Sequence, residues 1–118
     1  MDNNTLWFII GGIALVYLWK TFGPGHAASG AVVKAKLAAG AVIIDVRTSG
    51  EFSSGAYPKA RNFPLEVLSS KLEKIGSKDK SVVVYCASGS RSSQAVKMLK
   101  SAGFTDVTNA GGLRAMPR

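Results

Sequence analysis

Residues 81–103, SVVVYCASGSRSSQAVKMLKSAG, decide the fold. The first six are mostly apolar and β-branched and end on the only cysteine, Cys86, whereas the apolar residues after Ser92 recur at helical spacing. The stretch therefore predicts a strand, a short loop and a helix. The loop between Cys86 and Arg91 consists of small and polar residues: Ala87, Ser88, Gly89 and Ser90.

This loop is expected to favour a reactive cysteine. A tight loop that leads into a helix turns backbone N–H groups inward, and with the helix dipole they form an anion site. Such surroundings lower the pKa of a thiol below its free value of about 8.5 and favour the nucleophilic thiolate. Gly89 permits the curled backbone, and Arg91 adds a cation that suits an oxyanion. The alternative is that Cys86 is a buried residue before an ordinary turn.

The composition fits one small domain with an accessory segment, since the chain has 118 residues. Its formal net charge is +8, but the basic residues are scattered, without a basic run or interleaved aromatic residues. This argues against nucleic acid and favours attraction for small anions or anionic lipid. A single cysteine allows no internal disulfide, and with His26 as the only histidine the sequence indicates neither a metal nor a cofactor.

Residues 5–22, TLWFIIGGIALVYLWKTF, carry no charge before Lys20. As a helix they would be about 27 Å long, against a hydrocarbon core of about 30 Å. Trp7 and Trp19 lie near the two ends, as in an interfacial belt. We therefore expect residues 1–22 to form a single-pass transmembrane helix, with the domain in the cytoplasm because lysines follow the span. The alternatives are a cleaved signal, with a secreted or periplasmic domain, and a buried core helix.

The chain after this segment divides into a linker and a folded domain. Residues 23–29, GPGHAAS, form a turn-rich linker, and residues 30–118 form the domain. Ser29 is placed to cap a helix that Gly40 ends. The β-branched run at residues 41–46 then predicts a strand covered on both faces, as in a parallel sheet.

Two further helix starts are predicted. Thr48 or Ser49 precedes Glu51 at the spacing of a capping box. Pro64 is placed to start a second helix, whose apolar residues line one face. These residues are Leu65, Leu68, Leu72 and Ile75.

The remaining segments complete the alternation of strands and helices. Residues 61–63 predict a brief extended piece, residues 105–108 a last short strand, and residues 109–112 a turn. Residues 113–118 are expected to form a loose tail. The order predicts an α/β fold in which a small parallel sheet carries helices on both faces.

Two charged residues, Asp45 and Arg47, bracket the end of the first predicted strand. Ligands bind at the carboxyl ends of strands in open α/β sheets. We therefore expect Asp45 and Arg47 to support the Cys86 loop or contact substrate, with a structural role favoured for Asp45. Ser92, directly after Arg91, is grouped with them as a supporting residue.

The chain from about Ser29 to Gly112 resembles a single-domain rhodanese, a sulfurtransferase, in the segments IIDVRTSGEF, ARNFPLEVL, VVVYCASGSRS, MLKSAGF and TNAGG. The resemblance implies a rhodanese-like fold in which Cys86 is the nucleophile and the residues from Ala87 to Arg91 form the cradle of its persulfide. Phosphatases that share this fold have five residues between cysteine and arginine, whereas the sulfur-transferring members have four, as here. A phosphatase or arsenate reductase is therefore disfavoured.

The activity that this resemblance implies is sulfur transfer from thiosulfate or another persulfide donor to a thiol or cyanide acceptor, with no cofactor. The alternative is a membrane-tethered sulfur carrier or binding module with little turnover, which passes its persulfide to a docked protein. Ala87 favours this alternative, because thiosulfate-specific members often carry a cation at that position.

Overall fold

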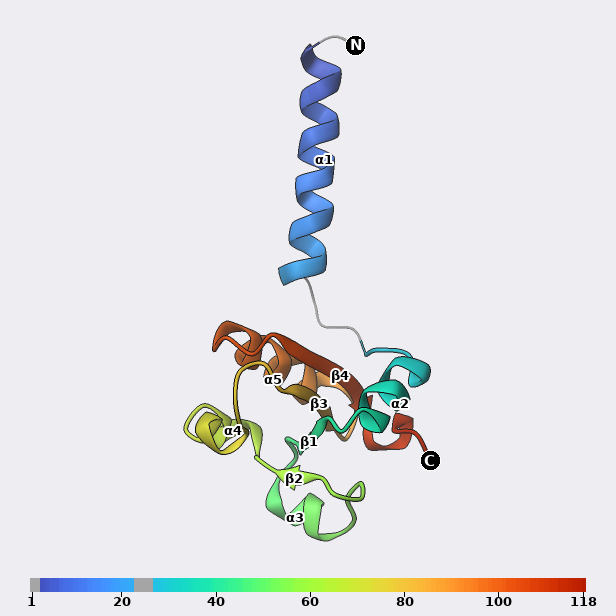
Figure 1. Ribbon diagram of the computed structural model, residues 1–118, viewed down its shortest axis with the longest axis vertical. Helices are drawn as coiled ribbons and strands as arrows, with labels where there is room; N and C mark the ends of the chain where they lie inside the picture. The colour runs from blue at the N-terminus through green and yellow to red at the C-terminus, as the bar shows by residue number, and fades with distance from the viewer. Residues whose placement is uncertain (1–2, 23–26) are drawn as a thin grey trace.

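The computed structural model describes residues 3–22 and 27–118. Figure 1 shows the order of the elements along the chain. They are α1 (Asn3–Phe22), α2 (Gly30–Ala38), β1 (Val42–Asp45), α3 (Ser49–Ser53), β2 (Arg61–Asn62), α4 (Leu65–Leu68), the 3-10 helix η1 (Leu72–Lys74), β3 (Ser81–Cys86), α5 (Ser90–Ser101), β4 (Asp106–Gly112) and the 3-10 helix η2 (Leu113–Ala115).

The four strands form one parallel sheet in the order β2-β1-β3-β4. β3 is a central strand, because β1 pairs along one of its edges and β4 along the other. Every residue of β3 from Val82 to Cys86 is fully buried. The predicted α/β fold with a small parallel sheet is confirmed.

Alternate residues of β3 contribute to two hydrophobic layers. Val82, Val84 and Cys86 belong to the core that includes Leu68 of α4 and Leu99 of α5. Val83 and Tyr85 belong to the opposite core, with Val33 of α2 and Met116 after η2. Because side chains alternate along a strand, β3 faces helices on both sides, and α2 and α5 flank it in Figure 1. Cys86 therefore faces the helix that follows it in the chain.

The predicted helix caps are present. The Ser29 side chain accepts from Val32 N, and Gly40 follows α2 with a φ of 90°. Thr48, rather than Ser49, is the N-cap of α3, and its hydroxyl and the Glu51 carboxylate form a reciprocal capping box. The local start and stop signals in the sequence were therefore sufficient for these two helices.

The single helix predicted after Pro64 is wrong. The structure has a short helix, α4, followed by a break and the 3-10 turn η1. At the break, the Ser70 hydroxyl donates to Val67 O at 2.8 Å and competes with the helical pattern of backbone hydrogen bonds. The apolar face survives the break, because Leu68 and Ile75 are both buried in the same core.

The turn and loose tail predicted for residues 109–118 are also wrong. β4 continues to Gly112 through a register shift opposite Val84 and Tyr85, and Asn109 Oδ1 accepts from Gly111 N at 2.9 Å within this irregular stretch. The chain then forms η2, after which Met116 is buried. The register skips Ala110, so the irregularity is a β-bulge, and the strand continues past it to end at the second glycine, Gly112.

The N-terminal segment forms the predicted helix, α1, but the predicted membrane span over residues 5–22 is not supported. Within the part of the chain that the structure describes, no helix is both long and apolar enough to cross a membrane. Residues 23–26 of the predicted linker, with His26, lie outside the described residues.

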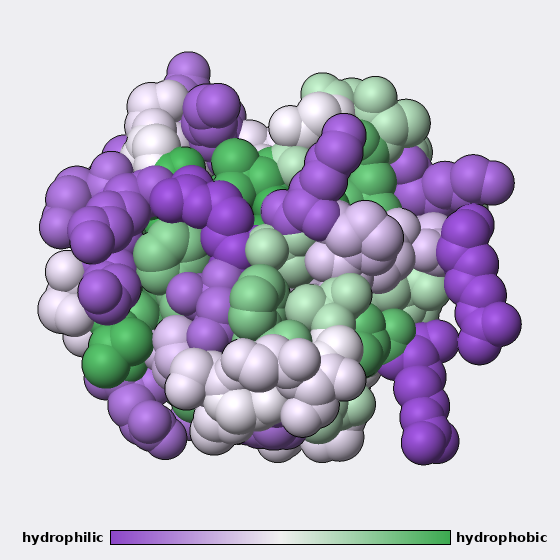
Figure 2. Space-filling model, turned by 90° about the horizontal axis from the view of Figure 1, so that it is seen from below, coloured by the Kyte–Doolittle hydropathy of each residue, from purple (hydrophilic) through white to green (hydrophobic). Residues whose placement is uncertain are grey.

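The folded domain presents a mixed surface in Figure 2, which views the molecule from below. Hydrophilic side chains project around the margin of this face, and hydrophobic residues lie between them. The hydrophilic side chains therefore surround this face without forming a single continuous patch.

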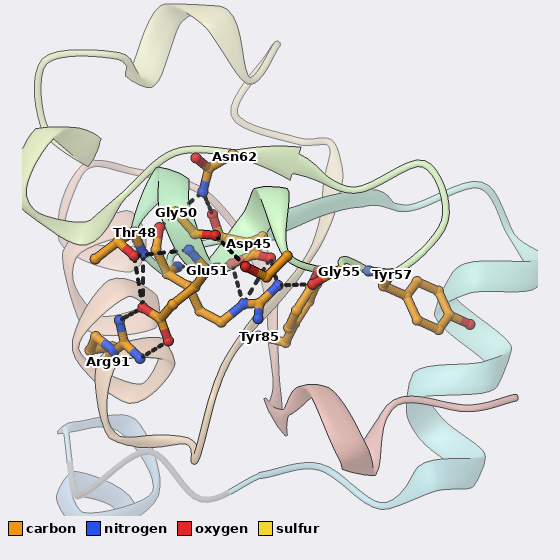
Figure 3. A network of polar contacts seen from close by, with 11 residues as sticks. Asp45, Thr48, Gly50, Glu51, Gly55, Tyr57, Asn62, Tyr85 and Arg91 are labelled. Atoms are coloured by element: carbon orange, nitrogen blue, oxygen red, sulfur yellow. Dashed lines mark hydrogen bonds and ion pairs between the residues drawn. The ribbon is translucent and has the colours of Figure 1, made fainter.

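Asp45 and Arg47 form an ion pair at the carboxyl end of β1. Asp45 is 0% exposed and Arg47 is 7% exposed, with Nη2 and Oδ2 2.7 Å apart. Arg47 Nη2 also donates to Gly55 O, and the Asn62 side chain donates to Asp45 O and Arg47 O. Figure 3 shows these contacts converging from β1, β2 and the loop after α3. The pair therefore ties together the segments around the end of β1.

Replacing Asp45 by Ala is expected to lower the free energy of unfolding by about 3–5 kcal/mol, because Arg47 would stay buried without its partner. Urea unfolding followed by circular dichroism measures this change. The matched control is Asp106→Ala, which removes an ion pair to Lys36 whose side chains are 36% and 37% exposed. That loss should stay within about 1 kcal/mol. Equal losses in the two variants would contradict the structural role of the buried pair.

Candidate active site

The central feature of the site is Cys86, the last residue of β3. Its side chain is buried, with an exposed fraction of 0%. The loop that follows Cys86 lies at the surface, since Ala87, Ser88 and Ser90 are exposed and Gly89 is partly exposed. The sulfur therefore lies directly beneath an exposed loop that leads into α5.

Hydrogen bonds curl this loop around the sulfur. Gly89 N donates to Cys86 Sγ at 2.8 Å, and the Cys86 thiol is 3.4 Å from Ser92 Oγ. Ser92 Oγ also lies 3.0 Å from Gly89 O. Gly89 has a φ of 106°, a conformation that residues with a side chain rarely adopt. The loop thus has the inward-facing N–H group that its composition suggested.

Two opposing influences act on the pKa of the Cys86 thiol. Burial, the largest, raises it, because a charged thiolate is poorly solvated beneath the loop. Hydrogen bonds from the Ser92 hydroxyl and from the N–H groups of Ser92, Gly89 and Ser88 lower it. Together they outweigh the burial, so the pKa lies below its ordinary value. The site therefore stabilises the thiolate mainly through neutral donors.

The end of β4 packs closely against the loop. A Cβ atom on Gly112 would lie 2.5 Å from Ala87 O, which is too close for any side chain. Gly111 O lies 3.4 Å from Ser92 Oγ on the same side of the site. The sequence predicted a turn at these glycines. The glycine pair itself is the only local feature of the sequence that could have indicated their place at the site. Gly112 is therefore a site residue, since it allows the loop carbonyl to approach.

Arg91 extends from the start of α5 to Glu51 of α3. Arg91 Nη1 and Glu51 Oε1 are 2.6 Å apart, and Nη2 and Oε2 are 3.0 Å apart. Figure 3 shows the guanidinium and carboxylate facing each other. Hydrogen bonding from Arg91 and then from Thr48 N lowers the pKa of Glu51 to about 2. Sequence analysis found only the capping role of Glu51, because nothing local connects two residues so far apart in the chain.

The sequence-predicted site residues occupy two neighbouring groups. Cys86, the residues from Ala87 to Arg91, and Ser92 come together around the sulfur and the start of α5. The side chains of Asp45 and Arg47 hydrogen-bond to each other rather than to the Cys86 sulfur, and Arg47 Nη2 also donates to Gly55 O. The contacts of this pair therefore join the end of β1 to the loop after α3.

Replacing Ser92 by Ala is expected to raise the pKa of the Cys86 thiol, because one donor to the thiolate is lost while burial remains. At neutral pH less thiolate will then be present. The ultraviolet absorbance of the thiolate, followed against pH, measures the midpoint. Ser101→Ala at the other end of α5 is the matched control and should leave the midpoint in place. An unchanged midpoint in Ser92→Ala would contradict this assignment of the hydrogen bond.

Similar proteins carry sulfurtransferase names. A sulfurtransferase from Allochromatium vinosum is 37% identical over 78 residues, covering 65% of this chain and 72% of that protein. The thiosulfate sulfurtransferase PspE from Escherichia coli is 37% identical over 78 residues, covering 64% of this chain and 75% of its own. The matches extend over most of each relative, so they concern more than a short motif.

A solved structure has the same fold. The human single-domain sulfurtransferase TSTD1 superposes with a TM-score of 0.67 at 28% identity, covering 75% of this chain and 92% of that protein. The sequence profile of the rhodanese-like domain matches residues 29–116, which include all four strands and the loop around Cys86. With most of its length matched by that profile, the chain belongs to the rhodanese-like domain family.

Proposed function

We propose that this protein is a sulfurtransferase that carries a sulfane sulfur on Cys86. One observation carries the proposal: Cys86 Sγ lies at the end of a central parallel strand and accepts a hydrogen bond from Gly89 N, within a four-residue loop ahead of Arg91. A lowered thiol pKa provides the thiolate that such chemistry needs. The relatives that bear sulfurtransferase names support the same reaction class.

The first half-reaction loads the sulfur. The Cys86 thiolate attacks the outer sulfur of a donor such as thiosulfate, so a new S–S bond forms at Sγ while the donor's own S–S bond breaks. Sulfite leaves with the electron pair of that bond. The product is a Cys86 persulfide, whose negative outer sulfur requires donors around it. The N–H groups of the loop can supply these, as in an oxyanion hole where a preorganised donor contributes about 3–4 kcal/mol.

The second half-reaction returns the thiolate. A nucleophilic acceptor, a thiol in the cell or cyanide in an assay, attacks the outer sulfur of the persulfide. The S–S bond to Cys86 breaks and its electron pair returns to Sγ, so the enzyme is regenerated without a redox cofactor. The same loop donors stabilise the anionic sulfur in both half-reactions, which is why one curled loop can serve donor and acceptor.

A second candidate is a sulfur carrier with little turnover, and one observation favours it. Cys86 is 0% exposed beneath its loop, so a donor or acceptor reaches the sulfur only when the loop moves. A docked protein could promote that movement more effectively than a small molecule. In this case the persulfide would form but discharge slowly to cyanide.

The test is intact-mass measurement of the full chain after incubation with thiosulfate, together with thiocyanate formation when cyanide is added. We expect a gain of one sulfur atom, discharge to cyanide with repeated turnover, and loss of both in Cys86→Ser. Loading without turnover would favour the carrier. If neither thiosulfate nor an alkyl persulfide adds sulfur at Cys86, sulfur transfer is wrong for this protein.

Replacing Gly112 by Ala is expected to lower the rate of sulfur transfer at least about tenfold, because its Cβ would displace Ala87 O and with it the loop donors. Steady-state thiocyanate formation provides the measurement. Gly30→Ala is the matched control, since no atom lies within 4 Å of a Cβ built there. Equal rates in the two variants would mean that the close approach of β4 to the loop does not matter for transfer.

A further inference from the structure

The charge of Arg91 is largely cancelled at the site. Both terminal nitrogens of its guanidinium bind the Glu51 carboxylate, at 2.6 and 3.0 Å, and the side chains are only 32% and 35% exposed. Glu51 is itself held in place, because its Oε1 accepts from Thr48 N and from Thr48 Oγ1, each at 3.1 Å. The carboxylate cannot swing away from Arg91 without also breaking the cap of α3.

The rest of the loop adds no charge to compensate. Ala87, Ser88, Gly89 and Ser90 have neutral side chains, and the donors to Sγ are N–H groups and a hydroxyl. The pKa of Glu51 is about 2, so its negative charge persists over any working pH range. Thiolate, Arg91 and Glu51 together therefore carry one net negative charge. A donor with two negative charges meets more repulsion here than a donor with one.

We propose that Glu51 is a positioning residue that determines which sulfur donor the site prefers. Because it neutralises Arg91, it favours sulfane-sulfur donors with a single negative charge, such as thiosulfonates, over dianionic thiosulfate. The inference rests on the proposed sulfur transfer and concerns its donor. In both cases the Cys86 thiolate attacks the outer sulfur. The leaving group is a sulfinate from a thiosulfonate and sulfite from thiosulfate, each departing with the electron pair of the broken S–S bond.

The experiment compares kcat/KM for thiosulfate with kcat/KM for methanethiosulfonate, a donor of similar shape with one charge fewer. In Glu51→Gln the thiosulfate-to-methanethiosulfonate ratio should rise about tenfold, because Arg91 becomes an uncompensated cation near the donor. Glutamine retains the capping geometry of α3, so the fold should be preserved. The rise should shrink at high salt, where the charge of Arg91 is screened.

Two further variants make the test independent of folding effects. Arg91→Gln leaves Glu51 unpaired, so the same ratio should fall, and the double variant Glu51→Gln with Arg91→Gln should return it toward its starting value. A ratio that follows the net charge of the pair in this way supports the inference, whatever happens to the absolute rates. If Glu51→Gln does not fold, the ratio measured in Arg91→Gln still tests the inference: a fall supports it and an unchanged ratio contradicts it.

Two control variants separate charge at the site from other effects. Thr48→Ala removes the hydroxyl that donates to Glu51 Oε1 but keeps the backbone N–H donor and the ion pair. Asp106→Asn frees Lys36 at the opposite end of the sheet from Cys86. Neither should change the ratio. A ratio unchanged in Glu51→Gln, while Cys86 still accepts sulfur, overturns the inference and leaves sulfur transfer standing. Failure of both donors to load Cys86 rejects sulfur transfer and this inference together.

Discussion

The burial of β3 between two parallel neighbours and two hydrophobic layers is the constraint on which the rest of the structure depends. Side chains alternate along a strand, so a strand covered on both faces has no freedom to rotate its last residue. Cys86 must then face the α5 layer, and Tyr85 must face the α2 layer. The chain returns directly into α5, which leaves only a short loop to curl over the sulfur. The site is thus a consequence of strand burial.

Local patterns in the sequence were enough to predict the elements that carry Cys86. The apolar run before Cys86, the caps at Ser29 and Thr48, and the strand–loop–helix order all depend on residues close together in the chain. Contacts between distant segments were not predictable in this way. The pairing of Glu51 with Arg91 and the packing of Gly112 on Ala87 arise only when the sheet brings separate segments together.

The wrong predictions have a related cause. A regular apolar spacing continued through residues 65–75, but the Ser70 hydroxyl bonds to Val67 O and the helix breaks. The glycines near the end of β4 suggested a turn, but pairing with β3 extends that strand through them. In both places propensity favoured one structure and a specific hydrogen bond or strand pairing selected another.

The two ion pairs near the site differ in environment and therefore in role. Asp45 and Arg47 are buried, and Arg47 donates to the backbone carbonyl of Gly55 in the loop after α3, so the geometry of the pair is fixed by the fold. Arg91 and Glu51 are about one-third exposed, so solvent weakens their attraction, but their charges still act on whatever approaches the loop. One pair contributes to structure and the other to the electrostatic potential of the site.

The complete burial of Cys86 has a consequence for its durability. Oxidation by peroxide to sulfenic and then sulfinic acid depends on both thiolate character and exposure. The lowered pKa of Cys86 increases the first, whereas an exposed fraction of 0% removes the second while the loop is closed. The same loop that hydrogen-bonds to the sulfur also covers it, so the structure combines a favoured thiolate with little access for peroxide.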